Sequence, residues 1–246
     1  MSAPALDLYG FPAADPKATS ASPFTTKVEC LLRLAGLSYN MHVVTNPGKT
    51  PRGKLPYLED GTTTVSDSEH IVAHLKAVHG VDLDATLAPQ ERAQSHALQR
   101  MIEERLYWII VYSRWIDPAN DGAVYEQFFG GLPPVLRGLI YRSALKTTKA
   151  ALHHQGLGRH TADEIYAFAA RDLEAIAQML GDKPYLFGDA PTMADVVVFA
   201  SITNIMRPDF KTALKALVEV RPNLLAHEKR MGKLYEEGAS IRSSSQ

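Results

Sequence analysis

The hydrophobic pattern of the chain changes near residue 80, and this change limits the folds that the chain can adopt. Before it, short apolar stretches alternate with polar residues or end at turn dipeptides, as β-strands do, with two helical stretches among them. From Pro89 onward, apolar residues recur at three- and four-residue spacing, as on the buried face of a helix. The polar, turn-rich segment 80–88 separates the two patterns. We therefore predict a small α/β domain in residues 1–80 and an all-helical domain in residues 89–246.

Composition excludes several classes of function. With 246 residues, of which 46% are hydrophobic and 22% charged, the chain can bury a full core. A formal net charge of −1 gives no electrostatic reason to expect nucleic-acid binding. No apolar run reaches membrane-spanning length and no basic residue precedes Lys17, so we expect neither a membrane span nor a secretory signal. The single cysteine, Cys30, rules out an internal disulfide and suits a reducing, cytoplasmic compartment; we expect it to be buried and inert.

The first domain is expected to run strand, helix, strand, strand, strand, helix. Strands are predicted at residues 5–10 and 39–44, and a hairpin over residues 57–65 that turns at Asp60-Gly61. The cap cluster Ser66-Asp67-Ser68 then opens a helix that ends near His79. This order is a βαβ unit followed by a ββα unit, which folds as a small mixed sheet with helices.

The helix over residues 22–36 is the best-marked element of this domain. Ser22 suits the N-cap, where its side chain accepts from an unpaired backbone N–H, and Pro23 suits the first helical position. Apolar residues from Phe24 to Ala35 form one buried face, and Gly36 suits the left-handed residue that ends a helix. A hydroxyl therefore lies at the positive end of the helix dipole, where an anion is favoured.

The second domain is predicted to be helical to its end. One long helix runs from Pro89 to about Asp117, and Trp108, Tyr112 and Trp115 form an aromatic stripe along it at i, i+4, i+7 spacing. Residues 153–160 are expected to be a loop, followed by a helix over residues 161–180.

A capping box marks the start of a further helix in this domain. Thr192 and Asp195 can satisfy reciprocal backbone donors there. The helix that follows is apolar nearly all round, and we expect it at the centre of the helical domain.

Four motifs together resemble the glutathione S-transferase superfamily. They are Ser22-Pro23-Phe24, Gly53-Lys54-Leu55-Pro56-Tyr57-Leu58, Asp67-Ser68, and Phe187-Gly188-Asp189 with Thr192 and Asp195. Their order and spacing are similar to those in superfamily members, in which a thioredoxin-like domain is followed by an all-helical domain. Residues 22–36 and 106–115 are also similar to the failed-axon-connections and metaxin-like branch. That branch mixes enzymes with scaffold and mitochondrial import proteins, so the resemblance indicates the fold better than the activity.

The resemblance implies a glutathione transferase that activates the thiol of glutathione for attack on a small hydrophobic electrophile, as detoxification enzymes do. A free thiol has a pKa of about 8.5, and a hydroxyl donor at a helix N-terminus can lower it by one or two units. Ser22 is our candidate donor, with Ser20 and Tyr9 as alternatives. A role for Ser22 as a helix cap alone is the structural alternative.

The resemblance also assigns glutathione contacts. Asp67 and Ser68 would bind the γ-glutamyl end, and the backbone of Leu55, before the cis-proline position Pro56, would pair with the ligand as an added strand does. Lys54 could meet the glycyl carboxylate or could be a solvated surface lysine.

The hydrophobic substrate would lie among aromatic side chains. The candidates for this role are Tyr9, Phe24, Trp108, Tyr112 and Trp115. An aromatic stripe at helical spacing also suits a core or a dimer interface, and a homodimer is expected from the resemblance.

Other chemistry is not expected. Thr25 stands where redox relatives carry a second cysteine, so we do not expect disulfide exchange to be the activity. His70 and His74 lie four apart on one helix, but the sequence supplies no evident third ligand, so we predict no metal site. The alternatives to a transferase are a glutathione-dependent lyase, isomerase or peroxidase, and a non-catalytic binding or assembly protein.

Overall fold

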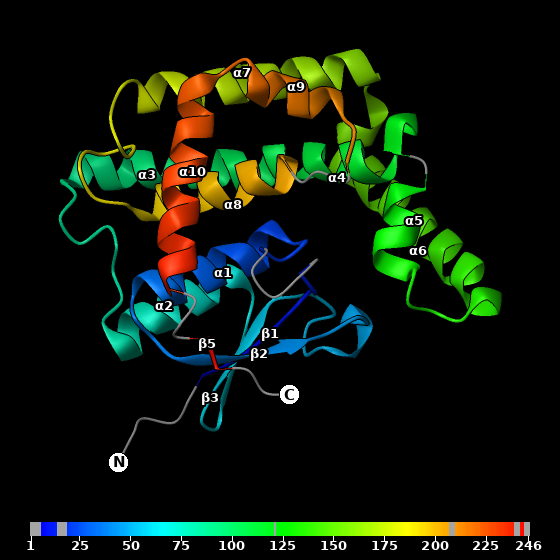
Figure 1. The fold of residues 1–246 in the computed structure, drawn as a ribbon, viewed down its shortest axis with the longest axis horizontal. Helices are drawn as coiled ribbons and strands as arrows, with labels where there is room; N and C mark the ends of the chain where they lie inside the picture. The colour runs from blue at the N-terminus through cyan, green and yellow to red at the C-terminus, as the bar shows by residue number, and fades with distance from the viewer. Residues whose placement is uncertain (1–5, 14–18, 121, 207–209, 239–241, 244–246) are drawn as a thin grey trace. The chain divides into compact units, whose positions relative to one another are not determined.

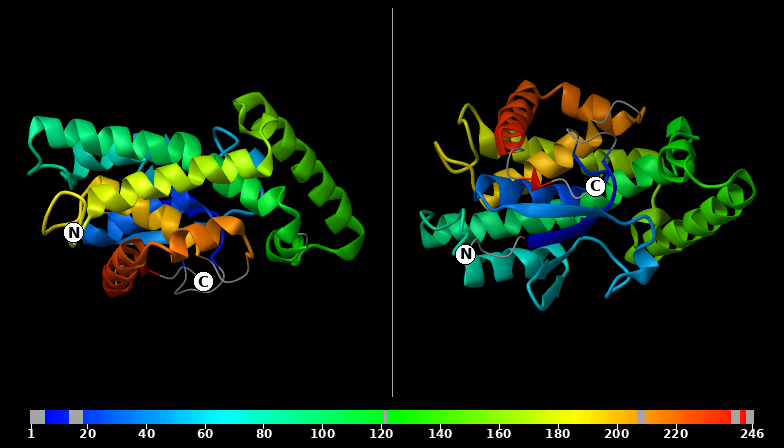
Figure 2. Two further views of the ribbon diagram at one scale, coloured as in Figure 1. Left: turned by 90° about the horizontal axis from the view of Figure 1, so that it is seen from above. Right: turned by 60° about the horizontal axis from the view of Figure 1, so that its bottom comes forward.

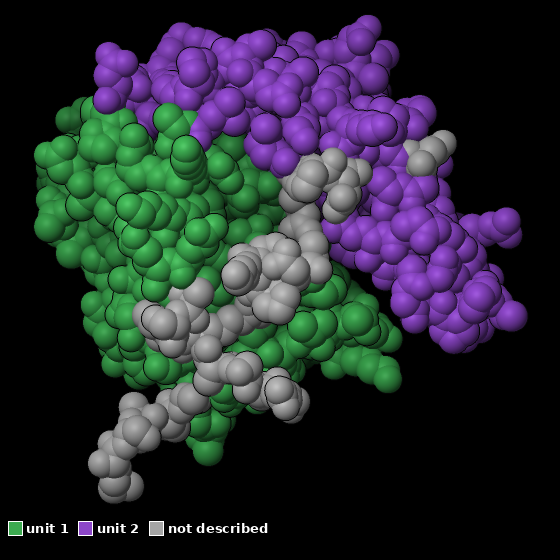
Figure 3. All heavy atoms as spheres, viewed as in Figure 1, with its two compact units in different colours: residues 1–96, 183–204, 226–246 green, residues 97–182, 205–225 purple. Residues whose placement is uncertain are grey.

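The computed structural model describes residues 6–13, 19–120, 122–206, 210–238 and 242–243. The chain divides into two compact units (Figure 3). Unit 1 comprises residues 1–96, 183–204 and 226–246, and unit 2 comprises residues 97–182 and 205–225. Unit 1 thus combines the sheet with segments that the sequence assigns to the helical domain. The domain boundaries 1–80 and 89–246 stay a prediction.

Unit 1 contains a five-stranded mixed sheet with the order β4-β3-β1-β2-β5 (Figure 1). The strands are β1 (Leu6–Gly10), β2 (Tyr39–Val43), β3 (Tyr57–Asp60), β4 (Thr63–Ser66) and β5 (Arg242–Ser243). Strand β1 pairs in parallel with β2 and antiparallel with β3, and β3 pairs antiparallel with β4. The predicted βαβ-ββα order is confirmed. The short β5, which pairs in parallel with β2, was not predicted.

Helices α1 (Pro23–Leu34) and α2 (Ser68–His79) lie together on one face of this sheet (Figure 1). Strand β1 alternates buried and half-buried residues, and its buried face meets α1. The contact is close at Gly10, where an added Cβ would lie 2.3 Å from Cγ2 of Thr25. A glycine is therefore needed for the strand to approach the first turn of α1.

The core of unit 1 also includes helical segments from late in the chain. Helix α8 (Met193–Ile205) begins at the predicted capping box, where Oδ2 of Asp195 accepts from the backbone N–H and hydroxyl of Thr192 at 2.9 and 2.6 Å. Side chains of α8, including Phe199, share one core cluster with β1 and α1. The apolar helix that we expected at the centre of the helical domain therefore packs in the core of unit 1.

The remaining helices complete the α-helical part. They are α3 (Pro89–Met101), α4 (Tyr107–Trp115), α5 (Ala123–Phe129), α6 (Pro134–Gln155), α7 (Ala162–Leu180), α9 (Ala213–Glu219) and α10 (Pro222–Glu237). A π-helical segment, Ile102–Leu106, joins α3 to α4, so the long helix predicted from Pro89 is present with one interruption. In unit 2, α5 packs against α6. Figure 2 shows the helices of this unit from two further directions.

The loop predicted over residues 153–160 begins too early, because His153 and His154 lie in the last turn of α6. Only the short segment around the 3-10 helix Leu157–Arg159 separates α6 from α7. Among the described residues, no helix combines the length and the apolar character that crossing a bilayer requires.

Candidate functional site

Ser22 caps α1 with its side chain, as predicted. Its backbone is extended, and its Oγ accepts from the backbone N–H of Thr25 at 3.4 Å. The residue is 9% exposed. Within the described part of the chain, Oγ of Ser22 accepts this hydrogen bond and donates none, so its proton is available to another group. A hydroxyl donor therefore lies at the positive end of the α1 dipole.

Ser20, the first alternative donor, has its hydroxyl engaged. Its Oγ donates to the carbonyl of Phe11 at 2.9 Å and accepts from the backbone N–H of Ser22 at 3.2 Å. The residue is completely buried. These bonds fix the loop that leads into α1, and the single hydroxyl proton of Ser20 is used in doing so.

Tyr9, the second alternative, lies on the other face of the sheet. Its neighbours Leu8 and Gly10 are on the buried face that meets α1, and strand residues alternate between faces. The Tyr9 ring stacks between His42 and Tyr57, with centroid separations of 4.5 and 4.2 Å, and its hydroxyl donates to Glu59 at 2.9 Å. Burial and this bond to Glu59 raise the pKa of Tyr9 to about 12.

Thr25 has a feature that sequence reasoning missed. The residue is completely buried, and its Oγ1 forms no hydrogen bond in the described part of the chain. Burying a hydroxyl without a partner costs about 1–3 kcal/mol. Thr25 lies in the first turn of α1, three residues after Ser22. The only signal for it in the sequence is its position, where redox relatives carry their second cysteine.

Asp67 and Ser68 stand at the N-terminus of α2. Oδ1 of Asp67 accepts from the backbone N–H of Glu69 at 2.9 Å, which caps the helix. The backbone of Asp67 has φ 86° and ψ 133°, and it is the one non-glycine residue with positive φ among the described residues. Such a conformation costs on the order of 1–3 kcal/mol and tends to occur at functional sites. Ser68 is 6% exposed, whereas Asp67 is exposed.

The segment before β3 contains the other predicted glutathione contacts. The Leu55–Pro56 peptide bond is cis, and both residues are buried. The carbonyl of Pro56 accepts from the backbone N–H of Asp67 at 3.4 Å, so this segment and the start of α2 are adjacent. Lys54 is exposed, and its carbonyl accepts from the hydroxyl of Thr50 at 2.8 Å. The structure thus brings Leu55, Pro56 and Asp67 together.

A buried polar network, which was not predicted from the sequence, holds α1 in place. Glu29 and Arg33, one turn apart on α1, are 1% and 4% exposed. The hydroxyl of Tyr39 on β2 donates to Glu29 and accepts from Arg33, each at 2.9 Å, and Arg33 also donates to the carbonyl of Tyr235 on α10 at 2.8 Å. Burial and the Glu29 carboxylate raise the pKa of Tyr39. These bonds fix the orientation of α1, and hence of its capped end.

Cys30 lies on α1 and is completely buried, as predicted. Burial raises the pKa of its thiol to about 12. Because the thiolate is the reactive form, this thiol is inert at neutral pH. The protein therefore offers no reactive cysteine of its own.

The predicted substrate-side aromatics are found in different surroundings. Phe24 is half-buried in the first turn of α1, in unit 1. In unit 2, Trp108 contacts Tyr107 edge to face, Tyr112 contacts Tyr166 in the same way, and Trp115 stacks on Phe128. Trp115 also packs against an apolar cluster of Val124, Phe129 and Phe210. Their role in holding a substrate stays a prediction.

Comparisons with solved structures identify the fold. A glutathione S-transferase of Ceriporiopsis subvermispora in complex with glutathione matches with a TM-score of 0.65 at 18% identity, over 96% of this chain and 98% of that one. The β-etherase LigF of Sphingobium sp. strain SYK-6 matches with a TM-score of 0.64 at 19% identity, over 95% of this chain and 100% of that one. The fold, a thioredoxin-like sheet domain with a helical C-terminal part, is the glutathione S-transferase fold.

Sequence comparisons agree. A family model for the glutathione S-transferase N-terminal domain matches residues 23–120, and one for the C-terminal domain matches residues 169–231. The chain is 31% identical to isoprene-epoxide–glutathione S-transferase of Rhodococcus sp. (strain AD45), over 87% of this chain and 93% of that protein. It is 34% identical to failed axon connections of Drosophila melanogaster, over 91% of this chain and 56% of that protein. Metaxin-1 of Sus scrofa is 27% identical over 85% of this chain and 69% of that protein.

The chain therefore belongs to the glutathione S-transferase superfamily, in the branch that includes failed axon connections and the metaxins. The resemblance seen in the sequence motifs is confirmed at the level of fold and family.

Proposed function

We propose that the protein is a glutathione transferase in which Ser22 stabilises the glutathione thiolate. This proposal is supported by a difference in the hydrogen bonds that the three candidate hydroxyls donate. Ser20 and Tyr9 each donate their proton within unit 1, whereas Ser22 lies at the helix N-terminus and donates to no described residue. A charge-assisted hydrogen bond is worth about 1.5–3 kcal/mol, which corresponds to a thiol pKa lower by one to two units.

Glutathione would be held by the end of unit 1 that carries the other predicted contacts. Asp67 would accept the γ-glutamyl amine, and the γ-glutamyl carboxylate would bind Ser68 and the backbone N–H groups that open α2. The backbone of Leu55 would pair with the cysteinyl part of the ligand, and Lys54 would meet the glycyl carboxylate. The strained backbone of Asp67 supports this assignment, because the helix cap alone does not require it.

An epoxide is the electrophile that we propose to test first. A transferase acting on isoprene epoxide is 31% identical to this chain and almost fully covered by it. The thiolate would attack a ring carbon, so that a C–S bond forms while a C–O bond breaks, and the alkoxide would take up a proton. The apolar part of the substrate would contact Phe24, which is half-buried in the first turn of α1. Lyase, isomerase and peroxidase reactions would use the same thiolate.

The test is a comparison of hydroxyl variants in glutathione conjugation. We expect Ser22→Ala to lower kcat/KM by about 10- to 100-fold, because losing this hydrogen bond raises the thiol pKa by one to two units and lowers the thiolate fraction at neutral pH. Ser20→Ala and Tyr9→Phe should retain most of the activity once their folding has been checked by circular dichroism. Unchanged activity in Ser22→Ala, or a larger loss in Tyr9→Phe, would contradict the assignment.

Thr25→Val is the matched variant for the second hydroxyl of this turn. Valine keeps the shape of threonine and removes a buried hydroxyl that has no described partner. If Thr25 has no part in catalysis, the variant should be fully active and at least as stable as the wild type. Lower activity with an intact fold would show that Thr25 shares the donor role with Ser22.

A second candidate function is a non-catalytic binding or assembly role in the same fold. The similarity to failed axon connections and the metaxins favours it. The two proposals differ in what glutathione does. A transferase should show an upward shift in Tm at millimolar glutathione, because a ligand that binds only the folded state stabilises it. The absence of any shift at saturating glutathione would favour the assembly role. A cytoplasmic homodimer is part of the transferase proposal.

A further inference from the structure

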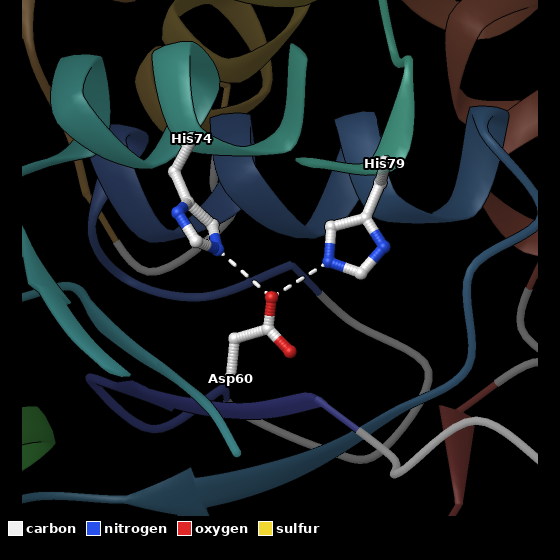
Figure 4. Close-up of side chains that lie close together, drawn as sticks. All are labelled: Asp60, His74 and His79. Atoms are coloured by element: carbon white, nitrogen blue, oxygen red, sulfur yellow. Dashed lines mark hydrogen bonds and ion pairs between the residues drawn. The ribbon is translucent and has the colours of Figure 1, made fainter. Parts of the chain in front are cut away.

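Three side chains from two elements of unit 1 converge at the end of the β3–β4 hairpin (Figure 4). Asp60 is the last residue of β3, whereas His74 and His79 belong to α2. Nε2 of His74 lies 2.8 Å from Oδ2 of Asp60, and Nε2 of His79 lies 2.7 Å from the same oxygen. The three side chains are 15%, 23% and 14% exposed for His74, His79 and Asp60. Two imidazole nitrogens thus face one carboxylate oxygen, and all three side chains are partly exposed to solvent.

This cluster differs from the histidine pair seen in the sequence. His70, which is exposed, takes no part in it. The partners of His74 in the cluster are His79, five residues further along α2, and Asp60, the last residue of β3. The third ligand that the sequence did not reveal is therefore supplied by the fold, which brings the end of β3 beneath the C-terminal half of α2.

We propose that Asp60, His74 and His79 bind a divalent transition-metal ion, with Zn²⁺ as the first ion to test. Two imidazoles and one carboxylate are a donor set that Zn²⁺ commonly uses, with a water molecule in the fourth position. Mg²⁺ and Ca²⁺ prefer oxygen ligands, so the site should discriminate against both. The three ligand atoms all lie within 4.8 Å of one another.

The three ligand atoms must move to bind an ion. Zn²⁺ binds nitrogen and oxygen at about 2.0–2.2 Å, so neighbouring ligands around a tetrahedral ion lie about 3.3 Å apart. The nitrogen–oxygen distances are 2.8 and 2.7 Å, so each must lengthen by about half an ångström. The two nitrogens, which lie within 4.8 Å of each other, must also come to about 3.3 Å apart. The other nitrogen of each ring, Nδ1, has no hydrogen-bond partner among the described residues and can carry the proton when Nε2 binds the ion. His79 is also the last residue of α2, and Gly80 follows it with φ 69°.

A metal ion here would join the C-terminal half of α2 to the hairpin. The same hairpin and helix carry the proposed glutathione contacts at their opposite ends, because Tyr57 pairs with Ser66 beside Pro56 and Asp67. The ion would therefore act as a structural clip on this part of unit 1. The metal proposal does not rest on the proposed transferase activity, and its test measures binding and stability.

The experiment is a titration of the full chain, prepared without a polyhistidine tag, with Zn²⁺ and separately with Mg²⁺. We expect one Zn²⁺ per chain by calorimetry and visible absorption bands of a bound ion when Co²⁺ replaces Zn²⁺. We also expect a rise in Tm of about 5 °C or more when free Zn²⁺ exceeds its Kd by 100-fold. Mg²⁺ should produce none of these effects. No binding of Zn²⁺ by the wild type would overturn the proposal.

Variants separate this cluster from the chain's other histidines. His79→Ala should weaken Zn²⁺ binding by at least about 100-fold, since it removes a direct ligand. Asp60→Asn should weaken binding similarly while keeping an acceptor for the imidazole N–H groups, so it serves if His79→Ala fails to fold. The matched control is His70→Ala, an exposed histidine of the same helix, and His153→Ala/His154→Ala controls for the surface pair on α6. Loss of binding in the controls with retention in His79→Ala and Asp60→Asn would also overturn the proposal.

Discussion

The N-termini of α1 and α2 are both capped by polar side chains, yet the two caps differ in backbone and exposure. Ser22 has an ordinary extended backbone and is buried, and its side chain accepts from Thr25. Asp67 caps α2 equally well but is exposed and has φ 86°. Capping a helix fully explains the extended backbone conformation of Ser22. It explains the positive φ of Asp67 only in part. A strained cap is stronger evidence for a ligand than a relaxed one, because folding alone does not favour it.

The largest effect is expected from Asp67→Gly, which separates strain from binding. Glycine accepts positive φ without cost and is a tolerable N-cap, so the free energy of unfolding should stay the same or rise by up to about 1 kcal/mol. Glutathione should bind about 10- to 150-fold more weakly, because a charged hydrogen-bonding group is lost. Chemical denaturation and calorimetry with glutathione measure the two quantities. A variant that keeps full affinity would reduce Asp67 to a helix cap.

A smaller effect is expected on stability from Ser22→Ala. Replacing a capping serine by alanine costs about 1 kcal/mol, which corresponds to a fall in Tm of about 2–4 °C in a protein of this size. Ser22→Gly should lower the free energy of unfolding by only a few tenths of a kcal/mol. Both variants should lose activity equally, because neither has a hydroxyl. If glycine restores activity together with stability, the serine acts through the helix and not through the ligand.

The smallest effect is expected from breaking the ion pair between Lys76, in the last turn of α2, and Asp82, which follows the helix. Nζ of Lys76 lies 2.8 Å from Oδ2 of Asp82, and this bond is the main reason why the pKa of Asp82 is lowered. A lowered pKa in the folded state means that the interaction stabilises the fold at neutral pH and is lost as the pH falls through that pKa. Because Lys76 is 57% exposed, Asp82→Asn should cost less than about 1 kcal/mol at pH 7. In urea titrations the difference from wild type should shrink below about pH 4; a constant difference would exclude this carboxylate as its cause.

Features set by a few neighbouring residues could be predicted from the sequence, whereas contacts between distant segments could not. Caps, glycine stops and turn dipeptides act over a few residues, so α1, α2, the hairpin and the helix after Thr192 were recognised from local signals. The placement of Tyr9 on the far face of the sheet depends on which face of β1 packs against α1, and the sequence of one strand does not reveal this. The same holds for contacts between distant segments, such as Arg33 with Tyr235 and Asp60 with His79. The interruption between α3 and α4 left no mark in the apolar spacing.

We propose that the hydroxyl of Ser22 holds the sulfur of glutathione as a thiolate at the N-terminus of α1. The most direct measurement is the ultraviolet absorbance of the thiolate of enzyme-bound glutathione as a function of pH, in the wild type and in Ser22→Ala. We expect the wild type to lower the pKa of the bound thiol by one to two units from about 8.5, and Ser22→Ala to return most of that shift. A bound thiol with the same pKa in both proteins would contradict the account.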